Sequence, residues 1–250
     1  ITRFQHTYCK DLAVKISIVK NSMDNVANRD AAIQFLSLLA TVQMHLSRMA
    51  EDFILYSTTE FNYLDLPEEF CTGSSYMPHK KNPDFLELVR GQTGNVYGNL
   101  TALLTLMKGL PLTYNRDMQL DKGPLFSSVD IVKEELTLMA EFVRGLKLNT
   151  GVVAEALKDQ TLYATEIAEF LVSKGVPFRS AHEIVGKLVR HAEDQGIDLT
   201  AIGDQELKGF SALLDRKAIS RIIAPLYAVS SKRSITAGAR DKKKHAPRHE

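Results

Sequence analysis

The sequence contains no tryptophan and only two cysteines, Cys9 and Cys71, among its 250 residues. Two cysteines can form one disulfide at most, which excludes a disulfide-rich scaffold and favours a reduced, cytoplasmic setting. Apolar runs stay below the roughly 18 residues that a membrane-spanning helix requires. The first residues also lack the basic and then apolar pattern of a secretory signal. We therefore expect a globular protein without a membrane partner.

An excess of charge of either sign is also missing, since the formal net charge is only +1 at pH 7. The basic residues that do cluster lie in 231–250, where seven Lys and Arg stand against two acidic residues. This distribution is typical of a basic tail and not of a folded surface that binds nucleic acid. Nucleic acid is therefore not an expected partner.

Periodic hydrophobic residues are what the sequence has in abundance. Between about 28 and 58 they recur at steps of three and four, as in Leu36, Leu39 and Leu46, which predicts one long amphipathic helix. Similar patterns predict further helices at about 83–108, 124–146, 150–158, 162–174, 178–195 and 204–214. No segment shows a convincing strand period. The predicted fold class is therefore all-α, with long helices of the kind found in bundles.

Breaks in the helical pattern divide the chain into three parts. Residues 1–148 are expected to form a portion of a central helical bundle, which a loop at 71–83 interrupts. Residues 149–215 contain shorter helices and are expected to form a small C-terminal helical domain. Residues 216–250 are expected to be poorly defined and to end in the basic tail. Because long loops inside compact domains often carry function, the loop at 71–83 is the first place to look for chemistry.

The segment 73–83 reads GSSYMPHKKNP and combines several groups that suit an anionic substrate. Asn82 is expected to cap the helix that follows, and Pro83 to occupy its first position. Free amides at a helix N-terminus, with Lys80 beside them, favour a carboxylate whose charge grows during a reaction. Glu87, one turn into that helix, could orient a partner group. From the residues alone, a plain turn with solvated lysines is the commoner explanation.

The pattern Gly-Ser-Ser-x-Met-Pro-x-Lys-x-Asn-Pro in this loop resembles the signature of the fumarase/aspartase superfamily. The flanking segments are similar to argininosuccinate lyases, above all GLPLTYNRDMQLDK at 109–122 and KGVPFRSAHE at 174–183. The resemblance covers about residues 21–214. Two positions depart from it: His79 stands where argininosuccinate lyases usually have glutamine, and Leu120 where they usually have glutamate.

The resemblance implies a lyase of arginine biosynthesis that splits argininosuccinate into arginine and fumarate by elimination across a C–N bond. It implies that Ser74 handles the proton at the carbon centre, its anion being stabilised by helix amides and Lys80. Lys80 and Asn82 would hold the carboxylate on which charge builds. Glu87 would pair with a histidine that acts at the leaving nitrogen.

Other residues are assigned to substrate binding by the same resemblance. Tyr114, Gln119 and Lys122 would bind polar and carboxylate groups, and Arg29 would help to organise the site. The alternative is that Tyr114 and Gln119 only order their own loop. The resemblance implies no cofactor, no metal and a small-molecule substrate, argininosuccinate. It also implies a homotetramer whose active sites combine residues of different subunits.

The partner histidine has no counterpart in the matching segments. The chain's histidines are His6, His45, His79, His182, His191, His245 and His249. None of them lies where the family has its histidine, and the upstream domain that also binds substrate is absent. We therefore expect a C-terminal part of such an enzyme, with little or no activity alone. The alternatives are a non-catalytic assembly protein like the lens crystallins of this family and, on account of His79, an adenylosuccinate-type lyase.

Overall fold

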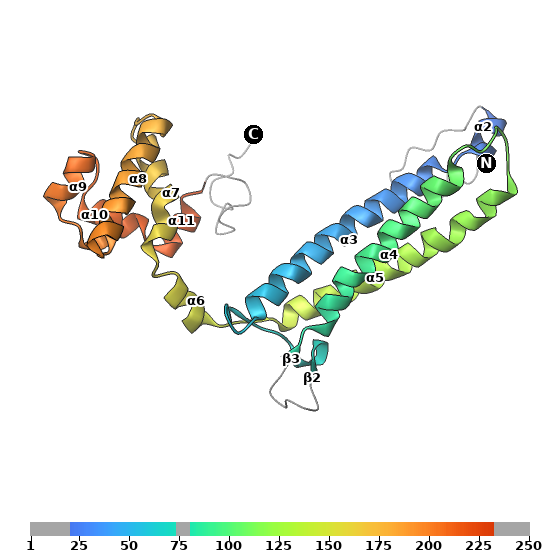
Figure 1. The fold of residues 1–250 in the computed structure, drawn as a ribbon, viewed down its shortest axis with the longest axis horizontal. Coiled ribbons are helices and arrows are strands. Elements are labelled where there is room, and N and C mark those ends of the chain that lie inside the picture. Colours follow the sequence, from blue (N-terminus) through green and yellow to red (C-terminus); the bar gives the residue numbers. More distant parts are fainter. Residues whose placement is uncertain (1–20, 74–80, 233–250) are drawn as a thin grey trace, which may run out of the picture. The chain divides into compact units, whose positions relative to one another are not determined.

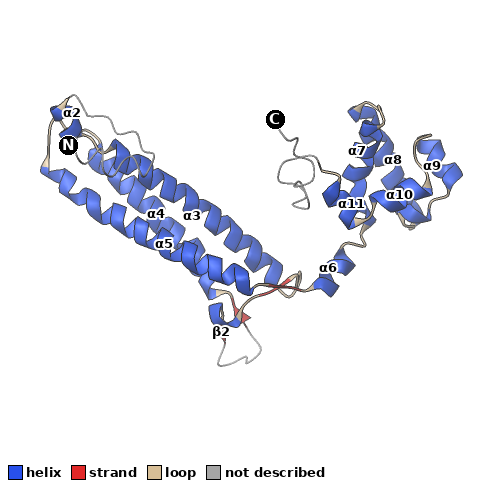
Figure 2. Cartoon of the chain, turned by 180° about the vertical axis from the view of Figure 1, so that it is seen from behind, coloured by secondary structure: helices blue, strands red, loops and turns tan. Residues whose placement is uncertain are grey.

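The computed structural model describes residues 21–73 and 81–232, most of which lie in helices (Figure 2). The predicted all-α fold class is therefore confirmed. The chain divides into two compact units, unit 1 (Ile1–Asn149) and unit 2 (Thr150–Glu250). Within the described ranges, no helix combines the length and the apolar character needed to cross a membrane.

Unit 1 is built on three long helices that run side by side (Figure 1). They are α3 (Asp30–Ser57), α4 (Asp84–Met107) and α5 (Lys122–Gly145), and the short α2 (Ser22–Ala27) precedes them. Each long helix begins and ends within two residues of the bounds predicted from its hydrophobic period. The three- and four-residue spacing therefore located the main elements of this unit correctly.

The core of unit 1 lies between the apolar faces of these helices. Leu36 of α3, Val96 of α4 and Val132 of α5 are buried in one cluster. Leu86 and Phe142 belong to a second cluster, which also includes residues that flank the loop at 71–83. Burying each such side chain contributes roughly 1.5–3 kcal/mol, and this shared interior stabilises helices that would be marginal in isolation.

In the described part of unit 1, four two-residue strands tie chain segments together where the sequence predicted no strand. β1 (Leu64–Asp65) pairs antiparallel with β4 (Lys147–Leu148), and β2 (Thr72–Gly73) pairs antiparallel with β3 (Lys81–Asn82). A strand of two residues is too short to show alternation, so the periodic pattern could not have revealed these pairs. The fold class is unaffected, but the second pair defines the base of the loop at 71–83.

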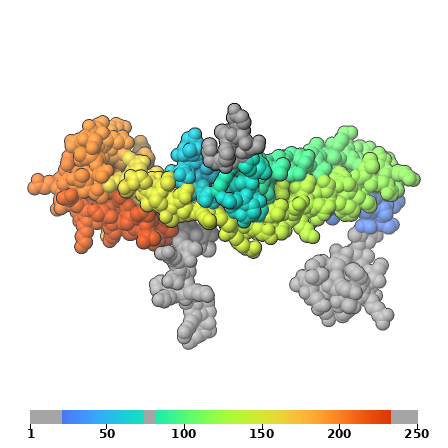
Figure 3. All heavy atoms as spheres, turned by 90° about the horizontal axis from the view of Figure 1, so that it is seen from below, coloured from blue at the N-terminus to red at the C-terminus, as the bar shows by residue number. Residues whose placement is uncertain are grey.

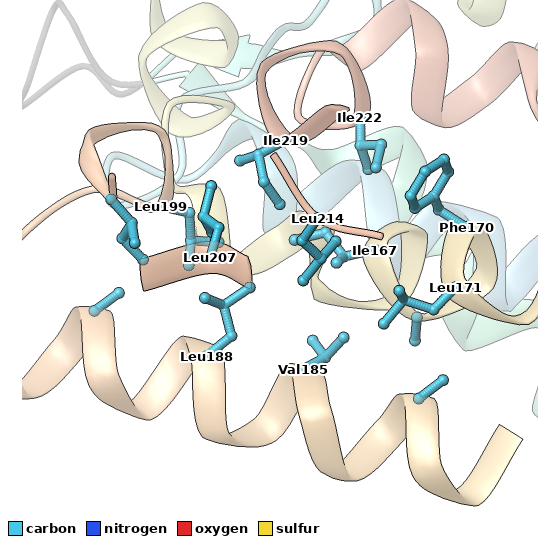
Figure 4. Packing of buried hydrophobic residues seen from close by; sticks show 14 residues of the cluster. Ile167, Phe170, Leu171, Val185, Leu188, Leu199, Leu207, Leu214, Ile219 and Ile222 are labelled. Atoms are coloured by element: carbon cyan, nitrogen blue, oxygen red, sulfur yellow. The ribbon is translucent and has the colours of Figure 1, made fainter. Parts of the chain in front are cut away.

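Unit 2 consists of short helices around one apolar core (Figure 4). Its elements are α6 (Thr150–Ala156), η3 (Gln160–Tyr163), α7 (Ala164–Ser173), α8 (Phe178–Gln195), η4 (Leu199–Ala201), α9 (Asp204–Phe210), α10 (Arg216–Ile222) and α11 (Pro225–Ser230). Leu171 of α7, Leu188 of α8 and Leu207 of α9 are fully buried in this core. Gly196 ends α8 with a left-handed φ of 62°, a conformation that glycine adopts without strain.

Residues 216–230 differ from the expectation of a poorly defined segment, because they form α10 and α11. Asp215 caps α10 by accepting a hydrogen bond from the Ala218 amide at 2.6 Å. Ile219 and Ile222 are fully buried in the core of unit 2. Helices of seven and six residues are too short to display a clear period. Burial in the core defines α10, whereas α11 has no fully buried residue and packs on that core through the partly buried Tyr227. The predicted basic tail beyond Lys232 lies outside the described residues.

Candidate active site at the two ends of the bundle

The loop that carries the predicted catalytic residues is closed at its base by β2 and β3. In this antiparallel pair Thr72 lies opposite Asn82, so the two ends of the loop are held together. The pair directly precedes α4 (Figure 1). Ser74 and Lys80, two of the four predicted catalytic residues, lie outside the described residues.

An aromatic cluster anchors this base to the bundle. The ring centroid of Phe70, just before β2, lies 5.2 Å from that of Phe85 on α4 and 5.5 Å from that of Phe142 on α5. Phe53 of α3 lies 5.7 Å from Phe142. Each such ring pair contributes about 0.5–1.5 kcal/mol beyond the burial of its area. All three long helices therefore help to fix where the loop begins and ends.

The helix after the loop begins one residue later than the sequence indicated. Asn82 does not cap it, because pairing with Thr72 holds Asn82 extended in β3. α4 starts at Asp84, and Pro83 stands at the N-cap position without a side-chain hydrogen bond. The Thr72 hydroxyl donates a hydrogen bond to the Asp84 carboxylate, which joins the base of the loop to the first turn of α4.

The charges around the base of the loop are partly compensated. Lys81 Nζ lies 3.2 Å from Glu68 Oε1 and 3.3 Å from Asp65 Oδ1. The hydrogen bond with Glu68, followed by that with Asp65, raises the pKa of Lys81. Lys81 is thus a compensated cation, with little positive potential left for a substrate anion. Of the remaining predicted catalytic residues, Asn82 is half-buried, and Glu87 is exposed on α4, where a group from elsewhere can reach it.

A second group of predicted site residues meets at the junction of α3 and α5. Arg29 Nε donates to Asp121 Oδ2 at 2.5 Å, and Lys122 Nζ donates to Asp121 Oδ1 at 2.8 Å. Arg29 directly precedes α3, whereas Asp121 ends η2 (Arg116–Asp121) and Lys122 begins α5. Burial raises the pKa of Asp121, but the hydrogen bonds from Lys122 and Arg29 outweigh it and bring the pKa below its usual value. Asp121 is therefore ionised at neutral pH.

Tyr114 and Gln119 form a further contact in the same connection between α4 and α5. Gln119 Nε2 donates to the Tyr114 hydroxyl oxygen at 2.6 Å, and both side chains are exposed. Thr113 has a φ of 78°, a left-handed conformation that is strained for a β-branched residue. Backbone strain of this kind concentrates at functional sites, so it favours a binding role for the segment 109–122 over a plain connection.

The two groups of predicted site residues lie at opposite ends of α4. Asn82 and Glu87 lie at its beginning, and the segment 109–122 follows its end (Figure 1). With 24 residues in α4, the helix separates the two groups by about 36 Å. The space-filling view shows the same separation between the teal residues at the start of α4 and the green residues beyond its end (Figure 3). Among the described residues, a single chain therefore does not bring Asn82 and Glu87 around the same substrate as the second group.

Asp121 belongs to the second group, although the sequence motif did not identify it as a site residue. Its place between Gln119 and Lys122 is the only sequence signal for it. Acidic residues are common on surfaces, and the pattern does not show that this one is buried between two cations. Among the described residues, no histidine pairs with Glu87: His45 of α3 and His182 of α8 are exposed, and His191 Nε2 of α8 lies 2.6 Å from Glu206 Oε1.

Comparison with known proteins places these residues in context. A family model described as "Lyase" matches residues 2–98, and one described as "Argininosuccinate lyase C-terminal" matches residues 161–230. The argininosuccinate lyase of Geotalea daltonii is 48% identical over 221 residues, which cover 88% of this chain and 48% of that protein. That of Alkalilimnicola ehrlichii is 51% identical over 195 residues, which cover 78% and 42%. The chain thus spans about half the length of the curated relatives it matches.

Solved structures agree with the helical fold. An EDDS lyase variant with bound fumarate matches with a TM-score of 0.72 and 26% identity, over 87% of this chain and 45% of that one. A class II fumarase from Schistosoma mansoni shares the fold with a TM-score of 0.67 and 21% identity, over 90% and 46%. Taken with the two family models and the near-half identity to curated relatives, these matches show that the chain belongs to the argininosuccinate lyase family of the fumarase/aspartase superfamily.

Proposed function

We propose that this chain supplies part of an enzyme that splits argininosuccinate into arginine and fumarate. The observation that carries the proposal is the 48% identity to an argininosuccinate lyase over 221 residues. In a chain of 250 residues, a match of that length has to include both the loop at 71–83 and the segment 109–122. The residues proposed for catalysis, together with Tyr114, Gln119 and Lys122 of the binding group, therefore lie within the matched part.

The proposed reaction is an elimination. A proton leaves the carbon beside a carboxylate, the C–N bond breaks, the C=C bond of fumarate forms, and the leaving nitrogen of arginine takes up a proton. We assign proton removal to Ser74, and stabilisation of the charged carboxylate to Lys80 and Asn82. Glu87 orients a histidine, supplied from outside the described residues, that acts at the leaving nitrogen. The exposure of Glu87 leaves room for such a partner.

Substrate binding is assigned to the opposite end of α4. Arg29 and Lys122 offer cationic donors to substrate carboxylates, and Tyr114 and Gln119 offer polar groups. The hydrogen bonds Arg29–Asp121, Lys122–Asp121 and Gln119–Tyr114 support this assignment, because they orient four otherwise flexible side chains. Orienting the binding groups in advance lowers the entropy lost when a ligand binds.

We propose a homotetramer with active sites shared between subunits, and the separation of the two groups supports it. Groups about 36 Å apart at the two ends of one helix cannot both touch the same small substrate, so in this proposal the two groups of one site come from different copies. The exposed apolar side chains Leu88, Tyr97 and Leu104 on α4 support an assembly that covers them. On the same helix, a methyl group added at Gly91 or Gly94 would meet nothing within 4 Å, which leaves room for another helix.

The proposal is tested with a chimera. The part of the Geotalea daltonii enzyme that this chain does not match is joined to this chain, and fumarate release is followed by ultraviolet absorbance. We expect turnover of argininosuccinate by the chimera and little or none by the 250-residue chain alone. Equal turnover by the isolated chain would contradict the view that a further segment completes the site.

The same assay separates the alternatives. Adenylosuccinate is offered in parallel, and preference for it would favour the adenylosuccinate-type lyase that His79 suggests. A folded tetrameric chimera without turnover of either substrate would favour a non-catalytic assembly protein.

The expected cytoplasmic location stays a prediction, which fractionation of cells that make the protein would test.

The role of Ser74 is tested separately in the active chimera. Because a positioned acid–base group typically contributes about 10²–10⁴-fold to a rate, Ser74→Ala should lower kcat by that order. Thr161→Ala, in unit 2, serves as a control that removes a hydroxyl far from the loop in sequence. Unchanged turnover in Ser74→Ala would remove Ser74 from the mechanism.

A further inference from the structure

Asp121 occupies a position that connects both cationic residues of the proposed binding group. Its side chain is only 10% exposed. One carboxylate oxygen accepts from Arg29 Nε at 2.5 Å, and the other accepts from Lys122 Nζ at 2.8 Å. Each oxygen therefore holds one cation, and the three side chains form a single network between the start of α3 and the start of α5.

The network leaves donors on both cations for a ligand. A guanidinium has five N–H donors. Among the described residues, Arg29 uses Nε for Asp121 and Nη1 for the carbonyl oxygen of Asn28, at 2.8 Å. Lys122 has three donors, of which one is directed at Asp121, and its side chain is 57% exposed. Two cations on one carboxylate carry a net charge of +1, which suits a carboxylate ligand.

A purely structural role explains the network less well. A carboxylate that is largely withdrawn from water loses hydration, and its ion pairs often return no more than that loss, so such a pair is a weak device for stability. It does fix direction, because without the shared acceptor the Lys122 ammonium can turn freely and the Arg29 guanidinium keeps only its hydrogen bond to the Asn28 carbonyl oxygen. The exposed Tyr114–Gln119 pair and the strained Thr113 lie in the same connection.

We propose that Asp121 is the positioning residue of the substrate-binding group: it holds Arg29 and Lys122 so that both direct their free donors at the same carboxylate of the substrate. This inference rests on the proposed function, since it concerns the same binding group. It adds a residue that does not touch the substrate and acts through its two partners.

The test uses the active chimera with Asp121→Asn, which keeps the volume of the side chain and removes its charge. Losing one charge-assisted hydrogen bond weakens binding by about tenfold or more, so KM for argininosuccinate should rise by that factor while kcat changes less. Asp121→Glu should recover part of the affinity. Glu51→Gln is the matched control, because Glu51 pairs with Arg90 at 2.5 Å between α3 and α4 and should leave KM unchanged. A lower melting temperature with unchanged KM in Asp121→Asn would overturn the proposal and leave a structural ion pair.

A second measurement does not depend on turnover. Fumarate is added to the chimera, and the NMR signal of the Arg29 Nε–H group is followed. We expect fumarate to shift this signal in the wild-type sequence and not in Asp121→Asn. The same shift in both proteins, or none in either, would contradict the positioning role. If the chimera releases no fumarate from argininosuccinate, the proposed function fails, and the NMR result still decides the role of Asp121.

Discussion

Glu135 of α5 is a carboxylic acid buried between the three long helices of unit 1. Its side chain oxygen Oε2 accepts from Gln43 Nε2 of α3 at 2.5 Å, and the same amide donates to the Val89 carbonyl oxygen of α4 at 3.1 Å. Gln43 Oε1 is buried without a partner among the described residues. The pKa of Glu135 is raised to about 7, chiefly by burial; the hydrogen bond from Gln43 opposes this shift, and the charge of Glu134 adds to it.

This raised pKa predicts a stability that falls as the pH rises. Between the ordinary value of 4.5 and about 7, the folded state binds a proton that the unfolded state has lost. The free energy of unfolding should therefore drop by up to about 3 kcal/mol across that range and then level off. Glu135→Gln stays neutral, so urea unfolding at pH 5 and pH 8 should show a smaller drop in this variant. Glu141→Gln, on the same helix but exposed, should keep the drop of the wild-type chain, and an unchanged drop in Glu135→Gln would contradict the assignment.

At the scale of single elements, α4 is a continuous helix although it contains glycines, which lower helix stability. Gly91, Gly94 and Gly98 lie within its 24 residues, and each costs up to about 1 kcal/mol relative to alanine. All three are exposed, and a Cβ at any of them would meet nothing within 4 Å. Packing inside the described chain therefore does not explain them, whereas the proposed approach of a helix from another copy would.

Gly94→Ala should consequently have two opposite effects. It should stabilise α4 by about 0.5–1 kcal/mol when the chain is dilute, because alanine loses less backbone entropy. It should also weaken self-association, because its methyl group enters the space proposed for a second copy. Light scattering over a concentration series measures the association. Gly186→Ala on α8, also with open space at its Cβ, should stabilise without changing association. If Gly94→Ala associates as the wild type does, α4 does not carry the interface there.

At the scale of the whole molecule, the chain contains separate cores. The core of unit 2 is formed entirely by residues of 164–227 (Figure 4), and the two buried clusters of unit 1 lie between 32 and 146. Each unit is thus expected to unfold without the other unit unfolding.

Leu188→Ala tests this independence. Leu188 is fully buried in unit 2, so the substitution should cost about 2–5 kcal/mol there. Hydrogen exchange should then accelerate across α7, α8 and α9 and stay unchanged in α3, α4 and α5. Leu103→Ala, at a buried position of α4, should produce the reverse pattern. Faster exchange in both units from either substitution would show that they unfold together.

Oligomeric state also belongs to this scale. Light scattering of the 250-residue chain should show association or aggregation, because the long helices expose apolar side chains such as Leu88 and Phe126. A homogeneous monomer would contradict an assembly through the bundle.

The sequence by itself determined the all-α fold, the long helices and the family. Apolar residues such as Leu36, Leu39 and Leu46 repeat with the helix period over many turns, and that signal is local. The residues of the loop at 71–83 and of the segment 109–122 are likewise chemical patterns that can be read without coordinates. Short elements were not predicted: β2 and β3 depend on pairing with each other, and α10 depends on burial in the core of unit 2, neither of which their own short sequences show.

Only the tertiary structure decided how the candidate site is distributed. The sequence order already separates Asn82 and Glu87 from Tyr114 by the helix predicted at 83–108, and α4 places the first two at one end of the bundle and Tyr114 at the other. Arg29 and Asp121 lie far apart in sequence and form one ion pair, because the start of α3 lies beside the start of α5. Such contacts depend on how helices pack, a long-range property that hydrophobic period and motif spacing do not encode.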